Sequence, residues 1–293
     1  MGVVPHIPKR PVNMTGAQLV YQKLLDNSVE DVFLYSGGSI MPLIDCFYQG
    51  PIDYYVNTHE QNCGHAATGY AKSSGNPGVC LVTSGPGITN MITPMLDATN
   101  DSTPMVVISG QVPLSATGTN AFQEAPAVEL SQHVTKWSYQ IQNINEIDVV
   151  MDTAFKVARH GKKGAVHIDI PKCISSAKIE NNNEDIDIIQ LNSILPNLTE
   201  PLDTDISDEY LKQIAEVINK SRKPIIYLGQ GCIDSFKIFR EFAKYNYIPV
   251  TSTIHALGIY NDHEEYSLRW CGMHGLAGAN YALQEADCII ALG

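Results

Sequence analysis

Three short polar segments carry the residue types that could do chemistry in this chain. They are Thr-His-Glu-Gln at 58–61, Thr-Ser-Gly-Pro-Gly at 83–87 and Gly-Gln-Val-Pro at 110–113, each just past an apolar run. A carboxylate such as that of Glu60 can move protons near neutral pH when a desolvated pocket raises its pKa. A Gly-Pro turn that opens a helix turns backbone N–H groups toward an anion. Taken alone, both features are generic, because the helix dipole also stabilises a glutamate in a first turn and a Gly-Pro start also suits a tight strand-to-helix turn.

The elements that must position these segments form an α/β pattern. Residues 31–35, 52–57, 78–83, 104–109 and 164–170 are apolar runs separated by helical patterns, which predicts a doubly wound parallel sheet covered on both faces. In such sheets ligands bind at the carboxyl edge. A helix is predicted over 60–74, with small side chains along one face. That face could meet a second subunit or pack on the helix's own sheet.

The chain divides into two predicted domains. Residues 1–175 form the first, and the acidic, turn-rich segment 176–205 is predicted to be a linker. Residues 206–293 begin a second α/β pattern, with a helix over 207–220 and strands over 224–228, 248–252 and 287–292. Three strands are about half of a doubly wound domain.

Composition limits the class of partner. The net charge is −12 and the pI is near 5.1, which argues against nucleic acid or an anionic membrane as a partner. Residues 1–12 contain no apolar core of a secretory signal, so we expect a cytoplasmic protein. Seven cysteines without a Cys-x-x-Cys pair indicate reduced thiols and no metal site built on cysteines.

Together these segments resemble the pyrimidine-binding domain of thiamine diphosphate enzymes, and among them the catalytic subunit of acetolactate synthase. The resemblance runs from about Asp31 to the end of the sequence. Its most specific part is Gly-Gln-Val-Pro at 110–113 followed by Ala-Phe-Gln-Glu at 121–124. Gly-Met-His-Gly at 272–275 is the second most specific signal.

The resemblance implies a role for each matching residue. Glu60 would face a ring nitrogen of the aminopyrimidine and share a proton with it. Phe122, Gln123 and Lys172 would lie near the reacting carbon or in the substrate channel. Further residues implied to bind cofactors in this part of the chain are Gly37, Gly38, Ser84, Pro86, Gly87, Ser102, Gln111 and Lys162. Taken alone, Phe122 would be assigned to core packing and Lys172 to a solvated loop end.

The second domain carries a dinucleotide-like pattern. Gly229-Gln230-Gly231 follows a strand, but Ser235 replaces the third glycine and no acidic residue ends the next strand, which argues against NAD. The family instead implies FAD, held by Gly229, Gln230, Gly231, Thr253, Ile254, Gly272, Met273 and His274. Lys162 stands where the family has Arg, Gln230 where it has Gly, and Cys173 where it has Asp.

The function implied is decarboxylation of pyruvate and transfer of the two-carbon unit to a second 2-ketoacid, in branched-chain amino-acid synthesis. The family uses thiamine diphosphate, Mg²⁺ and FAD and forms homodimers or homotetramers, with a regulatory subunit in some members. The Gly-Asp-Gly segment that anchors Mg²⁺ in the family does not occur here, so we expect an N-terminal fragment that is inactive alone. Two alternatives are a non-catalytic truncated paralogue that binds partner subunits and another thiamine diphosphate lyase or carboligase.

Overall fold

The computed structural model describes residues 13–48, 50–179, 195, 196, 198 and 206–293. The chain folds into two compact units, Met1–Pro201 and Leu202–Gly293, which we call unit 1 and unit 2. No helix among the described residues is both long enough and apolar enough to cross a membrane.

Unit 1 is built on a six-stranded sheet in which every pairing is parallel, in the order β2-β1-β3-β4-β6-β5. The strands are β1 Asp31–Leu34, β2 Asp53–Val56, β3 Gly78–Val82, β4 Met105–Gln111, β5 Trp137–Gln140 and β6 Ala165–Pro171. The helices are α1 Gly16–Asp26, α2 Met41–Asp45, α3 Glu60–Ser74, α4 Pro86–Thr89, α5 Ile92–Asn100, α6 Ala127–Ser131, α7 Ile147–Arg159 and α8 Lys172–Ser176.

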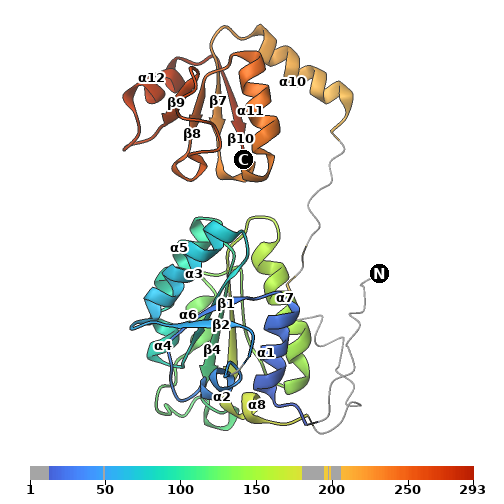
Figure 1. The fold of residues 1–293 in the computed structure, drawn as a ribbon, viewed down its shortest axis with the longest axis vertical. Coiled ribbons are helices and arrows are strands. Elements are labelled where there is room, and N and C mark those ends of the chain that lie inside the picture. Colours follow the sequence, from blue (N-terminus) through green and yellow to red (C-terminus); the bar gives the residue numbers. More distant parts are fainter. Residues whose placement is uncertain (1–12, 49, 180–194, 197, 199–205) are drawn as a thin grey trace. The chain divides into compact units, whose positions relative to one another are not determined.

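Helices cover both faces of this sheet, because its central strands are apolar on both faces. Val79 and Leu81 of β3 belong to the core cluster that includes α1 and α7, whereas Cys80 and Val82 belong to the cluster that includes α3 and α5. Figure 1 shows these two helical layers on either side of the strands. The predicted doubly wound α/β fold is confirmed.

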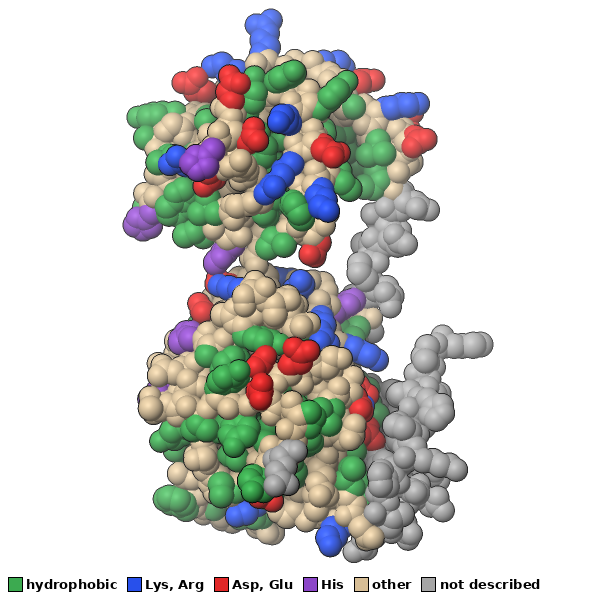
Figure 2. Space-filling view, in the orientation of Figure 1, with side chains coloured by type: hydrophobic (Ala, Val, Ile, Leu, Met, Phe, Trp, Pro, Cys, Tyr) green, Lys and Arg blue, Asp and Glu red, His purple; other side chains and the backbone are tan. Residues whose placement is uncertain are grey.

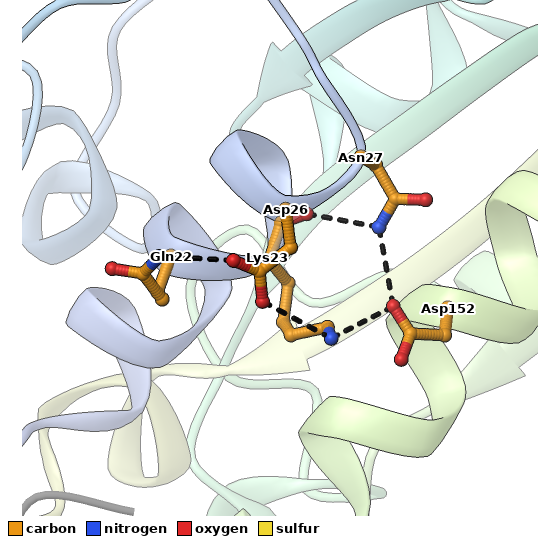
Figure 3. A network of polar contacts seen from close by, with 5 residues as sticks. All are labelled: Gln22, Lys23, Asp26, Asn27 and Asp152. Carbon is orange, nitrogen blue, oxygen red and sulfur yellow. Dashed lines mark hydrogen bonds and ion pairs between the residues drawn. The ribbon is translucent and has the colours of Figure 1, made fainter. Parts of the chain in front are cut away.

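An ion-pair network ties α1 to α7. Lys23 Nζ lies 2.8 Å from Asp152 Oδ1 and 3.3 Å from Asp26 Oδ2, and its side chain is 7% exposed. Asn27 Nδ2 donates to the same Asp152 oxygen at 3.2 Å (Figure 3). Burial lowers the pKa of Lys23, but the two carboxylates outweigh burial and raise it overall. Lys23 therefore stays charged in the folded protein.

The helix predicted over 60–74 is α3, and its buried small residues pack against its own sheet and α5. Cys63 and Ala67 are fully buried in the core cluster with β3, and a Cβ on Gly64 would lie 2.4 Å from Pro94 of α5. Gly75, at a φ of 79°, ends the helix in the left-handed conformation that glycine adopts without strain. This face packs within unit 1, as one of the two alternatives expected.

Two strands were not predicted, and two end later than predicted. β5 and β9 are sheet-edge strands of four residues whose side chains are mostly polar or half-buried. β4 and β6 pair beyond their apolar runs, so that Gly110 lies opposite Ile170 and Gln111 opposite Pro171. Gly110 and Gln111 thus belong to the strand and do not follow it.

Unit 2 contains a parallel sheet of four strands, one more than predicted, in the order β10-β7-β8-β9. The strands are β7 Pro224–Leu228, β8 Val250–Ser252, β9 Ser267–Trp270 and β10 Cys288–Leu292, and the helices are α10 Asp208–Lys220, α11 Phe236–Asn246 and α12 Ala277–Glu285. The core is small, and α10 has no buried residue. Hydrophobic side chains are accordingly spread over the face of this unit in Figure 2.

Most of the predicted linker, 176–205, lies outside the described residues. Its first residues belong to the packed part of unit 1. Ile179 is 3% exposed, and its N–H donates to the Met14 carbonyl at 3.0 Å. Gly16 N–H donates to the Ala177 carbonyl at 3.0 Å. Backbone hydrogen bonds therefore join the start of α1, near Met14, to the segment after α8, near Ile179.

Candidate active site

Glu60 is held at the carboxyl edge of the sheet as the first residue of α3. His59 caps the helix, with Gln61 N–H donating to its Nδ1 at 3.1 Å. Glu60 is 6% exposed, and Asn90 Nδ2 donates to its Oε2 at 2.9 Å. Oε1 accepts no hydrogen bond from any residue that the structure describes. The carboxylate is thus buried and oriented, and one of its oxygens is open to a ligand.

The loops after β1 and β3 meet at the topological switch point of the sheet, where ligands bind in open α/β folds. Ser39 Oγ lies 2.9 Å from Thr83 Oγ1 and accepts from Ser84 N–H at 2.9 Å. A Cβ on Gly37 would lie 2.4 Å from the Thr83 side chain, so only glycine allows this approach. The predicted residues Gly37, Ser84 and Gly87 therefore lie together where these two loops meet, with Ser84 and Gly87 buried and Gly38 and Pro86 exposed.

The loop that carries Phe122 and Gln123 closes on itself and packs against the loop after β3. Glu124 accepts from Gly118 N–H and from Ala121 N–H, and these bonds, chiefly that from Gly118, hold the pKa of Glu124 below its usual value. Gln123 has a φ of 60°, a strained conformation for a residue with a side chain. A Cβ on Gly85 would lie 2.7 Å from the Gln123 carbonyl oxygen. The two loops fit only because Gly85 is a glycine.

Gln111 joins this loop to the sheet. Its Nε2 donates to the Ala125 carbonyl at 3.1 Å and to Asp169 Oδ2 at 3.0 Å, and its Oε1 accepts from Val112 N–H at 2.9 Å. Gln140 Nε2 donates to the same Asp169 oxygen at 2.9 Å, and the Ser109 hydroxyl donates to Oδ1. Both amide hydrogens of Gln111 are therefore used within the protein.

Asp169 and His167 form a buried polar pair on β6 that the sequence did not flag as a site. Because Ser109 donates to the carboxylate, His167 Nε2–H donates to Ser109 at 2.8 Å and Nδ1 accepts from Ser131 at 2.7 Å. Burial raises the pKa of Asp169 to about 6 and lowers that of His167 to about 3. His167 is thus neutral and offers the carboxylate no positive charge.

Phe122 and Lys172 point outward at the carboxyl edge. Phe122 is 88% exposed, and Lys172 begins α8 with an exposed side chain. Core packing is therefore wrong for Phe122. An exposed aromatic ring and an ammonium group at this edge are groups that a substrate could contact.

Ser102 and Lys162 lie at the opposite edge of the same sheet. Ser102, with a φ of 54°, precedes β4, and Lys162 precedes β6. Their loops are neighbours, since Met105 N–H donates to the Gly164 carbonyl at 3.3 Å. The structure therefore separates these two predicted cofactor ligands from Glu60.

In unit 2 the predicted flavin residues share one edge of the sheet. Residues 229–231 follow β7, Thr253 and Ile254 follow β8, and residues 272–274 follow β9. Met273 is 90% exposed, and a Cβ on Gly272 would meet no atom within 4 Å. Packing alone also requires glycine at position 229. A Cβ there would lie 2.1 Å from the carbonyl oxygen of Gly293, at the end of the neighbouring strand.

Asn90 and Ser39 are the functional candidates that sequence reasoning missed. Asn90 reaches Glu60 from the end of α4, and Ser39 bridges two loops that lie far apart in the sequence. No local motif marks either residue. Asp169 and His167 did carry a signal, since both are polar side chains within a strand predicted to be covered on both faces.

Comparison with known proteins agrees with this geometry. Residues 14–130 match the thiamine pyrophosphate enzyme N-terminal TPP binding domain, and residues 211–293 match the thiamine pyrophosphate enzyme central domain. The chain therefore belongs to the thiamine pyrophosphate enzyme family.

Within this family the chain is homologous to acetolactate synthase catalytic subunits. It is 40% identical over 291 residues to the mitochondrial catalytic subunit of Saccharomyces cerevisiae, which covers 96% of this chain and 42% of the relative. It is 39% identical over 287 residues to the acetolactate synthase large subunit of Corynebacterium glutamicum, covering 97% and 44%. It is 39% identical over 279 residues to the chloroplastic acetolactate synthase 1 of Zea mays, covering 95% and 43%. The chain thus spans less than half the length of these relatives.

Proposed function

We propose that this chain provides the pyrimidine-binding and central parts of an acetolactate synthase. The reaction is decarboxylation of pyruvate and transfer of the two-carbon unit to a second 2-ketoacid, which leads toward branched-chain amino acids. The observation that carries the proposal is Glu60, a buried carboxylate at the carboxyl edge of a parallel sheet. One of its oxygens is held by Asn90, and the other accepts nothing from the described residues.

This arrangement fits the aminopyrimidine ring of thiamine diphosphate. When bound, the cofactor supplies the electron sink for decarboxylation. Glu60 Oε1 would hold a proton at the ring nitrogen, and the position of that proton would be fixed because Asn90 orients the carboxylate. Ser84, Gly87 and the Gln111-tethered loop would exclude water around the ring, while Phe122, Gln123 and Lys172 would contact the ketoacid.

The metal site, the oligomeric state and the cellular location are also proposals. The described residues contain no cluster of three or more His, Cys, Asp or Glu suited to a metal, so Mg²⁺ and the diphosphate would be held by other residues of the assembled enzyme. We expect a homodimer or homotetramer, with a regulatory subunit as a possible further partner. Location in the cytoplasm stays a prediction, since the relatives include mitochondrial and chloroplastic proteins.

The test of the proposed function is acetolactate formation from pyruvate by the full-length gene product. Glu60→Gln keeps the shape and the Asn90 contact but cannot share a proton in the same way. We expect kcat to fall by about 10²- to 10⁴-fold, the usual contribution of a positioned acid–base group. Glu30→Gln, an exposed glutamate just before β1 at the opposite edge of the sheet, is the matched control and should keep full activity.

Near-normal turnover by Glu60→Gln would reject the role of this residue. If the unmodified protein forms no acetolactate from pyruvate but condenses other 2-oxo acids such as glyoxylate, the enzyme is another thiamine diphosphate carboligase. If it converts no 2-oxo acid with thiamine diphosphate and Mg²⁺ present, the non-catalytic alternative holds.

We also propose that FAD binds at the carboxyl edge of the unit 2 sheet. The support is the shared position of Gly229, Gln230, Gly231, Thr253, Ile254, Gly272, Met273 and His274 at that edge. His274→Ala should weaken flavin binding about fivefold, because one hydrogen bond contributes about 1 kcal/mol. His263→Ala, an exposed histidine before β9, is the control. A titration of each purified variant with FAD, followed by flavin absorbance, measures its affinity for FAD. If His274→Ala binds FAD as tightly as His263→Ala, His274 is not part of the site.

A further inference from the structure

Asp169 is the one carboxylate fully buried beneath the carboxyl edge in the described part of unit 1, and the proposed chemistry does not use it. It is 0% exposed, and no Lys, Arg or His among the described residues forms an ion pair with it. Glu129 is the charged group whose field acts on it, and that field is repulsive. A buried charge without a cation costs folding free energy, so its retention calls for an explanation.

The contacts of Asp169 lead directly to the loop that carries Phe122 and Gln123. Its Oδ2 accepts from Gln111 Nε2 at 3.0 Å, and the same amide group donates to the Ala125 carbonyl at 3.1 Å. An amide nitrogen has two hydrogens, so both donors of Gln111 are committed, one to the carboxylate and one to the loop. The acceptor at Asp169 therefore sets the rotation of the Gln111 amide.

The rest of the loop is fastened chiefly to itself. Glu124 accepts the N–H groups of Gly118 and Ala121, and Glu124 N–H donates to the Ala121 carbonyl at 2.9 Å. A loop closed in this way can shift as a unit. Its polar tether to the sheet among the described residues is the Gln111 bond to Ala125, and its backbone at Gln123 abuts Gly85.

We propose that Asp169 is a positioning residue that orients Gln111 and thereby fixes the loop 118–125 against Gly85, in the loop that leads through α4 to Asn90 and its bond to Glu60. Its effect on turnover rests on the proposed function, whereas its effect on the loop does not. Loss of the acceptor at 169 frees Gln111 to rotate, and the loop then samples positions in which Gln123 no longer packs on Gly85.

The test compares variants of the full-length protein by hydrogen exchange of residues 118–125 and by steady-state kinetics. Asp169→Ala removes the acceptor. Asp169→Asn restores it, because the asparagine oxygen can accept from Gln111 while its Nδ2 donates to Ser109. The Ser109 hydroxyl then donates to His167 Nε2, and His167 takes the tautomer whose Nδ1–H donates to Ser131. Gln140→Met is the matched control, since it removes a donor to the same oxygen from β5 and leaves the loop tether intact.

Relative to exchange in α1 and α7, Asp169→Ala should raise exchange of the loop at least tenfold and lower kcat at least tenfold. Asp169→Asn should return both to within about threefold, and Gln140→Met should leave loop exchange unchanged. Equal loop exchange in Asp169→Ala and Gln140→Met, or an asparagine variant as impaired as the alanine variant, would overturn the proposal. If Asp169→Ala does not fold, Gln111→Met supplies the comparison, and a loop as protected as in the unmodified protein overturns it. A protein inactive on pyruvate would reject the proposed function and leave the exchange result decisive for Asp169.

Discussion

At the scale of single residues, the polar groups beneath the candidate site impose a stability cost. Asp169 has a pKa near 6 in the folded protein against an ordinary value of 3.8, chiefly because burial disfavours its charge. Between these values the folded state binds more protons than the unfolded state. Stability from this group is therefore fully present below pH 3.8 and is lost as the pH rises through about 6.

Asp169→Asn should remove that cost. The shift corresponds to about 3 kcal/mol, so the variant should be more stable than the unmodified protein at pH 7.5 by up to about that amount. The difference should shrink to near zero as the pH falls to about 4. Urea unfolding of both proteins from pH 4 to 8 measures it, and a difference that does not change with pH would contradict the assigned pKa.

The residues of the site could be predicted from the sequence only where a local motif carries them. Glu60, Ser84 and Gly87 lie together at one edge of the sheet, as the motifs indicated. Asn90 and Asp169 could not be found in that way. Each is defined by a hydrogen bond to a residue at least 30 positions away, and such pairs are created by strand order and not by spacing.

At the scale of elements, the strands of the sheet interior were predictable and those at the edges were not. β3 is apolar on both faces because helices cover it, which gives a continuous hydrophobic run. β5 consists of Trp-Ser-Tyr-Gln with every side chain half-buried, so it lacks the continuous apolar run from which the other strands were predicted, although its aromatic and polar side chains do alternate. The strand ends were off by one or two residues where pairing continues through Gly110, Gln111 and Pro171.

The α1–α7 ion pair should contribute to the stability of unit 1. Lys23→Met keeps the apolar stem but removes the charge between Asp152 and Asp26. We expect the free energy of unfolding to fall by about 1–3 kcal/mol, as for hydrogen bonds to charged groups. The chain has two tryptophans, so Trp137 fluorescence in a Trp270→Phe background reports urea unfolding of unit 1.

Lys72→Met is the comparison for this prediction. Lys72 lies 2.7 Å from Asp101 on the other side of the sheet, but its side chain is 37% exposed. Exposed pairs contribute about 0–1 kcal/mol, so this variant should lose much less stability. If both variants lose the same free energy of unfolding, burial of Lys23 does not strengthen its ion pair with Asp152 and Asp26.

At the scale of the whole molecule, both units present their candidate loops at the carboxyl edge of a parallel sheet, and both leave apolar surface uncovered. Tyr54, Tyr55 and Val56 of the edge strand β2 are 47%, 49% and 63% exposed. Ile289 of the edge strand β10 is 52% exposed, and the apolar face of α10 contains no buried residue. Such edges invite pairing with further protein, which supports the proposal of an oligomer.

The contact between the glycine loop after β7 and the end of β10 has a consequence for the order of events during synthesis. Gly229 N–H donates to the Leu292 carbonyl at 2.6 Å, and residues 229 and 231 are shaped by the backbone of Gly293. A ribosome makes β7, β8 and β9 before it makes β10. The glycine loop therefore cannot take its final form until β10 has emerged and inserted beside β7. A flavin at this edge would then bind only after β10 has paired with β7 and could not guide the early folding of unit 2.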